Sequence, residues 1–209
     1  QDTRGFAVMT DMPVLEPATL QEAYDFTKYA FELSEAIHSP VFLRSVTSLS
    51  QSHGIVDVEA RTLPEEGHPL FEHNMERYTK AGAAICMNQH KSLIARLEKA
   101  QTEIAGKGLN AIDWKAEGGP GLVAVGVVNS YVAEAMAMLE GAGIDLNGLS
   151  VLHVKTSCPY PDAELTALLK HCGKILVAEE LEPYVENRAY LDAYKAGVQV
   201  PILGKNDGT

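Results

Sequence analysis

Three carboxylates near the end of the sequence lie close enough together to take part in acid–base chemistry. Glu179, Glu180 and Glu182 follow the apolar run 174–178 (KILVA), which predicts a buried strand. Ligands bind at the carboxyl ends of such strands, and a desolvated carboxylate there can act as a general acid or base. The same residues would also stabilise the start of a helix, with Glu182 as its cap and Pro183 in its first turn. The residues alone favour the helix start.

The seven histidines show no spacing that is typical of a metal centre. His68 and His73 lie in an irregular, acidic stretch, where zinc would need at least a third ligand at fixed geometry. His53 follows the last predicted strand of the first region, at the edge where open α/β sheets bind ligands. It is therefore a candidate site residue, and a solvated loop histidine is the alternative. We predict no metal site on this chain.

The three cysteines, Cys86, Cys158 and Cys172, are far apart, and the chain contains no C-x-x-C sequence. An iron–sulfur cluster needs closely grouped thiolates, so the spacing excludes a cluster built within this chain. A disulfide framework is equally disfavoured. We expect three buried free thiols.

The run GGPGLVAVG, residues 118–126, is the nearest match to a dinucleotide-binding loop. In such loops the glycines join a strand to a helix, so that backbone amides reach the pyrophosphate. Here the glycines precede the apolar run instead. The pattern predicts a glycine-rich entry to a buried strand.

The elements that must position these residues are clearest in the last ninety residues, where strands and helices alternate. This alternation predicts right-handed crossovers and a mostly parallel sheet of roughly four or five strands. We expect strands at 122–128, 149–154, 174–178 and 198–202, and helices from Asn129 or Ser130 (as cap) to 140, at 161–171 and at 182–196. Residues 120–209 are therefore predicted to form one α/β domain.

The first sixty residues predict a strand, a helix and a second strand. A short apolar run ends at Leu15, and Thr19 and Glu22 form a capping box that begins a helix. Pro40 ends that helix, and 41–46 predicts a buried strand. Residues 1–60 thus read as the closing part of an α/β domain.

Residues 61–119 show no strong strand signal and predict a connector. Within it, the apolar positions of 88–105 have helical spacing among many charges, which is typical of an amphipathic linker helix. Gly106-Lys107-Gly108 should end that helix.

Composition excludes several classes of partner. The net charge of −11 disfavours nucleic acid and anionic membrane surfaces, and no apolar run approaches the roughly 20 residues that span a bilayer. The first residues, QDTRGFAVMT, lack a secretory pattern, so a cytoplasmic location is expected. Because the chain begins with Gln1 instead of Met, we expect it to be a piece of a longer protein.

Two long stretches carry a resemblance that is more specific than the physical patterns. QDTRGFA, with MPVLEPATLQEAYDFTKYAFELSEAIHSPVFLR, and GLVAVGVVNSYVAEAM, with TSCPYPDAELTALLKHCGKILVAEELEPYVE, resemble the 2-oxoacid:ferredoxin (or flavodoxin) oxidoreductases. EELEPYVE and the loop GKNDG resemble the alpha subunit of the indolepyruvate type. Nearly all of the chain is covered.

The resemblance implies a fold and an activity. The fold is the end of a thiamine-diphosphate pyrimidine-type domain, a helical linker and a transketolase C-terminal-like domain. The activity is CoA-acylating oxidative decarboxylation of an arylpyruvate in an anaerobic cytoplasm, with ferredoxin as electron acceptor and a second subunit in an oligomer. Thiamine diphosphate with magnesium and the iron–sulfur clusters would lie outside this piece, which alone should bind no cofactor and be inactive.

The resemblance also assigns residues. Asp2, Arg4 and His53 would lie at the edge of the cofactor site, and the activating glutamate would lie upstream of this chain. Glu179, Glu180 and Tyr184 would be a structural or interfacial motif. Two alternatives stay open: a pyruvate or 2-oxoglutarate member of the same superfamily, and a non-catalytic domain that docks a partner or contacts coenzyme A.

Overall fold

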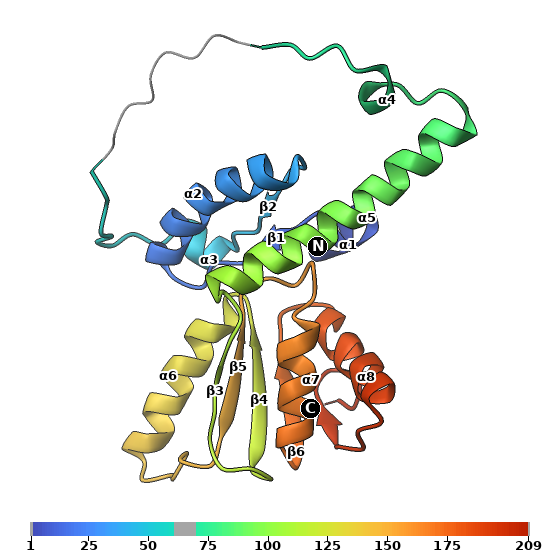
Figure 1. Ribbon diagram of the computed structural model, residues 1–209. Coiled ribbons are helices and arrows are strands. Elements are labelled where there is room, and N and C mark those ends of the chain that lie inside the picture. Colours follow the sequence, from blue (N-terminus) through green and yellow to red (C-terminus); the bar gives the residue numbers. More distant parts are fainter. Residues whose placement is uncertain (1, 61–69, 209) are drawn as a thin grey trace.

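The computed structural model describes residues 2–60 and 70–208, in which a long helix runs between a small N-terminal part and a larger sheet (Figure 1). In chain order, the first half contains α1 (Arg4–Thr10), β1 (Val14–Leu15), α2 (Leu20–Ile37), β2 (Phe42–Leu43), α3 (Thr47–Ser50), α4 (Met75–Tyr78) and α5 (Gly82–Lys107). The second half contains β3 (Ala111–Asp113), β4 (Pro120–Val125), α6 (Val128–Gly141), β5 (Ser150–Val154), α7 (Asp162–His171), β6 (Lys174–Ala178), α8 (Tyr184–Ala196) and β7 (Ile202–Leu203).

The C-terminal sheet is mostly parallel, as the alternation predicted. Its order is β3-β5-β4-β6-β7, and only β3 runs antiparallel to its neighbour. The central strand β4 places Val123 opposite both Leu152 and Val177. A strand with neighbours on both sides and helices on its faces must be apolar throughout, which explains the run LVAV.

The main core lies between one face of this sheet and the helices α7 and α8. The amphipathic pattern of α7 turns Leu165, Leu168 and Leu169 inward, and each is at most 1% exposed. They pack against alternate residues of β4, β5 and β6, which point to the same face. In Figure 1, α6 lies on the opposite side of the sheet from α7 and α8.

The N-terminal part is the predicted β-α-β unit, with β1 and β2 parallel. The Thr19 hydroxyl caps α2 by accepting a hydrogen bond from the Glu22 N–H at 3.1 Å. The Glu22 carboxylate reaches back to the Ala18 N–H at 2.7 Å, one residue earlier than in the usual capping box. One buried face of α2 packs on the C-terminal half of α5.

The expectation that the second strand is buried was wrong. Phe42 and Leu43 of β2 are 39% and 38% exposed, because β2 is at the edge of a two-stranded sheet within the described residues. Four short elements were also missed, namely α1, α3, α4 and β3. The short helix α1 follows Thr3 without a side-chain cap, and β3 lies in the stretch where no strand was expected. An edge strand of three residues leaves little pattern in a sequence.

Other boundaries moved. α5 begins at Gly82 instead of Asn88 and ends, as expected, before Gly108, whose φ of 64° suits glycine. The last strand is Ile202–Leu203 instead of 198–202. His68 and the proposed domain boundary near residue 61 lie outside the described residues. Within the described part of the chain, no helix is both long and apolar enough to cross a lipid bilayer.

Candidate functional site

The carboxyl ends of β4 and β6 form the place where a sheet of this topology usually takes a ligand. β5 lies on one side of β4 and β6 on the other, so the strand order reverses at β4, which is where such sheets usually leave a crevice. Here side chains from the N-terminal part occupy that edge. Backbone bonds fix them, from the Val14 N–H to the Cys158 carbonyl and from the Glu16 N–H to the Lys155 carbonyl, both at 2.8 Å.

Arg4 is the centre of this contact, and its side chain is only 1% exposed. Its Nη1 donates to Glu179 Oε2 at 2.6 Å, and its Nη2 donates to Asp2 Oδ2 at 2.6 Å. Nη2 also donates to the carbonyls of Glu180 and Glu182, the latter at 2.9 Å. The guanidinium carbon lies 5.2 Å from the centre of the Tyr184 ring. Nε donates to Asp2 Oδ1 at 3.1 Å, so all three guanidinium nitrogens are hydrogen-bonded, as expected for a buried arginine.

Glu179 links this arginine to the start of α8. Its carboxylate accepts hydrogen bonds from the N–H groups of Val185 at 3.2 Å and Glu186 at 2.9 Å. The helix-start interpretation of the acidic cluster is thus confirmed for Glu179. Glu182 is not the cap, because Pro183 occupies the N-cap position. The N–H groups of the first helical turn donate instead to the buried carboxylate of Glu179. Burial raises the pKa of Glu179 although Arg4 and the two N–H groups oppose the shift.

Arg44 also bridges two carboxylates, beside Arg4. Arg44 Nη1 donates to Glu16 Oε2 at 2.8 Å, and its Nη2 donates to Glu180 Oε2 at 3.3 Å. The Ser157 hydroxyl donates to the other oxygen of Glu16. Gly126 is required next to this carboxylate, because its φ is 57° and an added Cβ would lie 3.0 Å from Glu16 Oε2. Together, Arg4, Arg44 and the carboxylates of Asp2, Glu16, Glu179 and Glu180 form what we name the arginine clasp.

Asn129 holds the turn that precedes α6. Its Nδ2 donates to the carbonyls of Ala124 at 3.0 Å and Gly126 at 2.8 Å, while its Oδ1 faces His153 Nδ1 at 2.8 Å. The predicted helix-capping role of Asn129 or Ser130 was therefore wrong, because α6 begins after Val127 without a side-chain cap. The Ser130 hydroxyl instead donates to the Ala18 carbonyl at 2.6 Å, which adds another bond to the N-terminal part.

The loop GKNDG is held by a fully buried carboxylate. Glu186 of α8 accepts the N–H groups of Lys205 at 2.9 Å and Asn206 at 3.2 Å. A Cβ at Gly204 would lie 2.7 Å from the Glu186 carboxyl carbon, so only glycine lets the loop approach this closely. The two sequence features EELEPYVE and GKNDG therefore meet in one hydrogen-bonded unit.

The structure brings together five of the six candidate residues: Asp2, Arg4, Glu179, Glu180 and Tyr184. His53 takes no part in the bonds of the arginine clasp and is exposed after α3. Sequence reasoning missed Glu16 and Arg44. Glu16 precedes a proline at a strand end, and nothing in that local pattern distinguishes a buried carboxylate from an exposed one.

The ion pairs and hydrogen bonds of the arginine clasp hold the N-terminal part against the C-terminal sheet. The Glu179 carboxylate accepts hydrogen bonds from an arginine and two backbone N–H groups. It therefore has little capacity left to exchange protons with a ligand. Among residues 2–60 and 70–208, no three or more His, Cys, Asp or Glu side chains are grouped so that they could hold a metal ion.

The three cysteine thiols differ in their exposure to solvent. Cys158 and Cys172 are buried and free, whereas Cys86 is exposed on α5, which corrects the prediction of three buried thiols. Burial raises the pKa of Cys158 to about 12, so this thiol stays protonated and unreactive at neutral pH.

The known proteins that are similar to this chain in sequence carry one name. It is 36% identical to the indolepyruvate oxidoreductase subunit IorA of Pyrococcus abyssi over 212 aligned positions, covering 99% of this chain and 32% of that protein. The IorA subunit of Methanothermobacter thermautotrophicus is 32% identical, over 100% of this chain and 33% of its own length. The chain thus spans about a third of the curated relatives that it matches. No family model matches the chain.

Solved structures support the fold. A 2-oxoglutarate:ferredoxin oxidoreductase from Magnetococcus marinus matches with a TM-score of 0.63 at 17% identity, covering 92% of this chain and 39% of that chain. A split-gene transketolase matches with a TM-score of 0.52 at 18% identity, covering 98% of this chain and 52% of its own. The fold is therefore α/β with a mostly parallel sheet, in which the C-terminal part is like a transketolase C-terminal domain. By sequence, nearly the whole of this chain is similar to about a third of the length of the indolepyruvate oxidoreductase subunits named IorA.

Proposed function

We propose that this chain is part of the alpha subunit of a thiamine diphosphate-dependent 2-oxoacid:ferredoxin oxidoreductase that converts an arylpyruvate to its acyl-CoA derivative. The observation that carries this proposal is the similarity of nearly the whole chain to subunits named indolepyruvate oxidoreductase. A second subunit, ferredoxin and coenzyme A are the partners that the proposal requires, within an oligomer in the cytoplasm.

The proposed role of this segment is to fix the geometry between two domains. Thiamine diphosphate, when bound in the complete enzyme, would supply the stabilisation of a carbanion formed by decarboxylation. The arginine clasp joins residues 2–44 to the C-terminal sheet by two buried or nearly buried arginines. A catalytic centre needs such rigid support, because small displacements of positioned groups reduce rates strongly.

The described residues do not fit a magnesium diphosphate site. The carboxylates at the sheet edge are bound to arginines and backbone N–H groups, and no metal-ligating group is formed in the described part of the chain. We therefore place thiamine diphosphate and magnesium on other parts of the complete enzyme. Asp2 and Arg4 would support the cofactor site from its edge, and His53, which is exposed, would be free to do so.

Titration of this chain with thiamine diphosphate and magnesium tests that placement. We expect no saturable, magnesium-dependent binding at micromolar concentrations by isothermal calorimetry. The complete alpha subunit is the positive control and should bind under the same conditions. Micromolar, magnesium-dependent binding by the chain alone would contradict the proposed division of the site.

Activity of the complete complex tests the substrate. Reduction of ferredoxin in the presence of coenzyme A is expected to be at least about tenfold faster, by kcat/KM, with indolepyruvate or phenylpyruvate than with pyruvate, about 1.4 kcal/mol of discrimination. Faster turnover of pyruvate or 2-oxoglutarate would instead assign the enzyme to another member of the superfamily. Absence of any oxoacid oxidation would refute the enzymatic proposal.

A further inference from the structure

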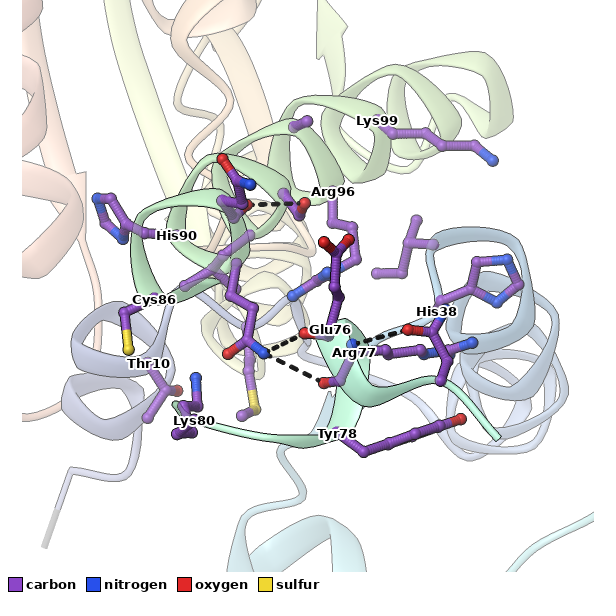
Figure 2. Close-up of a pocket in the computed structure, with 18 of the residues that line it drawn as sticks. Thr10, His38, Glu76, Arg77, Tyr78, Lys80, Cys86, His90, Arg96 and Lys99 are labelled. Atoms are coloured by element: carbon purple, nitrogen blue, oxygen red, sulfur yellow. Dashed lines mark hydrogen bonds between the residues drawn. The ribbon is translucent and has the colours of Figure 1, made fainter. Parts of the chain in front are cut away.

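A second site lies away from the sheet edge, in a cavity of about 1180 Å³. The ends of α1 and α2, the α4 segment and the first half of α5 border this open cavity, and Figure 2 shows most of the side chains that line it. Small-molecule sites commonly measure about 300–1,000 Å³, so this cavity is large enough for a ligand of nucleotide size. It shares no residue with the arginine clasp.

The lining is cationic although the chain is acidic. Arg77, Lys80, Arg96 and Lys99 line the cavity, and Glu76 is the only acidic side chain that lines it among the described residues. The whole chain, by contrast, carries a net charge of −11. A concentration of positive charge in a concave site raises the local concentration of anions.

The positive charge of Arg96 has no acidic partner among the described residues. Within residues 2–60 and 70–208, its guanidinium makes no hydrogen bond or ion pair, and its Nε is shielded from solvent. Lys80 likewise has no partner in the described part of the chain. A buried nitrogen of a guanidinium without an acceptor is unfavourable, and native proteins normally provide one. The missing acceptor points to an anionic ligand.

The two sides of the cavity are held in place. Gln89 of α5 donates through Nε2 to the carbonyls of Glu76 at 2.5 Å and Thr79 at 3.0 Å, which fixes the α4 segment against α5. Asn74 caps α4 by accepting the Arg77 N–H at 3.0 Å. Arg77 and Lys80 thus line the cavity from the α4 side and Arg96 lines it from α5, while Arg77 Nη1 also lies 3.5 Å from Glu72 Oε2.

An aromatic ring completes the lining. Tyr78 borders the cavity and is 59% exposed. The Arg77 guanidinium carbon lies 5.3 Å from the centre of its ring and the Phe71 ring stacks on it at 6.5 Å, so a planar group would contact the part of the ring that these two leave exposed. Stacking on such a ring is favourable for any nucleobase. We propose that this cavity binds a nucleoside diphosphate or a related phosphate-bearing ligand, with its phosphates on Arg96, Lys80 and Arg77 and its base against Tyr78.

Calorimetric titration of the whole chain with ADP at low ionic strength tests the proposal. Saturable binding is expected, and Arg96→Met should weaken it at least about tenfold. Lys91→Met is the matched control, since it removes one positive charge from the same helix outside the cavity, and it should change the affinity less than about twofold. Lys80→Gln, at an exposed position, gives a second variant and should weaken ADP in the same direction.

Other probes separate the contributions. Inorganic pyrophosphate should bind more weakly than ADP, and Tyr78→Leu should remove that difference while leaving pyrophosphate binding unchanged. Absence of ADP binding, or equal losses in Arg96→Met and Lys91→Met, would overturn the proposal. Binding of polyglutamate peptide but not ADP would also overturn it, in favour of a protein partner.

Thiamine diphosphate also carries a diphosphate, so its binding to this cavity must be distinguished from its binding at a cofactor site. Binding that Arg96→Met abolishes would belong to this cavity. Magnesium-dependent binding that survives Arg96→Met would contradict the proposed division of the cofactor site and leave the cavity proposal intact.

Discussion

Arg4→Met is expected to lower the free energy of unfolding by about 3–5 kcal/mol, the usual loss when one partner of a buried ion pair is removed. The Arg4 side chain is 1% exposed and that of Glu179 is 0% exposed, so solvent screens neither charge. Methionine keeps most of the volume but leaves Asp2, Glu179 and two carbonyls without their donor. Urea denaturation, followed by circular dichroism, measures the change.

A surface pair provides the control for this variant. Lys28 and Glu59 also form an ion pair, but their side chains are 41% and 81% exposed. Lys28→Met should therefore change the free energy of unfolding very little. Equal losses in the two variants, or a loss of under about 1 kcal/mol in Arg4→Met, would show that the arginine clasp does not hold the two parts together.

The loss caused by Arg4→Met should grow as the pH rises. Burial raises the folded-state pKa of Glu179, and removal of Arg4 must raise that pKa further. Below the unfolded-state pKa of about 4.3, Glu179 is protonated in both states and costs nothing. Above it, the unfolded chain ionises first, so stability falls until the pH passes the folded-state pKa. Unfolding curves of both proteins at pH 4 and pH 8 measure the difference.

Glu186→Ala is expected to lower the free energy of unfolding by about 2–4 kcal/mol, since it leaves the N–H groups of Lys205 and Asn206 without an acceptor. The C-terminal loop should also open. Hydrogen exchange at Lys205 and Asn206 should therefore become faster, while exchange in β4 should report only the global loss.

Two further variants separate packing from hydrogen bonding at this position. Glu186→Gln keeps an acceptor oxygen and the shape of the side chain, so it should recover part of the lost stability. Glu140→Ala, at an exposed position of α6, should have little effect. If the Lys205 and Asn206 amides keep their protection in Glu186→Ala, Glu186 does not hold the loop.

Repetitive patterns predicted most of the fold. The buried strands of the C-terminal sheet and the spacing of α2 and α7 repeat over several residues, and the structure contains these elements close to the expected positions. The missed elements, α1, α3, α4 and β3, are short and lack such repetition. The exposure of β2 depends on its neighbours in space, which local sequence does not encode.

The site was predictable only in part, for a related reason. Asp2 and Arg4, at one end of the chain, and Glu179, Glu180 and Tyr184, at the other, were identified separately. Their meeting depends on how the N-terminal part packs on the sheet, which no local pattern specifies. Likewise, the capping partner of α8 is the strand-end Glu179, although Glu182 fits the usual sequence pattern for a cap.

The arginine clasp has a consequence for how the chain folds. Arg4 and Glu179 are separated by 175 positions in sequence, so their pairing closes nearly the whole chain into one loop. The entropy of closing a long loop must be lost before such a contact is gained, and folding rates fall as contacts become less local. The sheet can form from neighbouring strands and helices without this contact. We therefore expect the clasp to form late in folding and to act mainly by slowing unfolding.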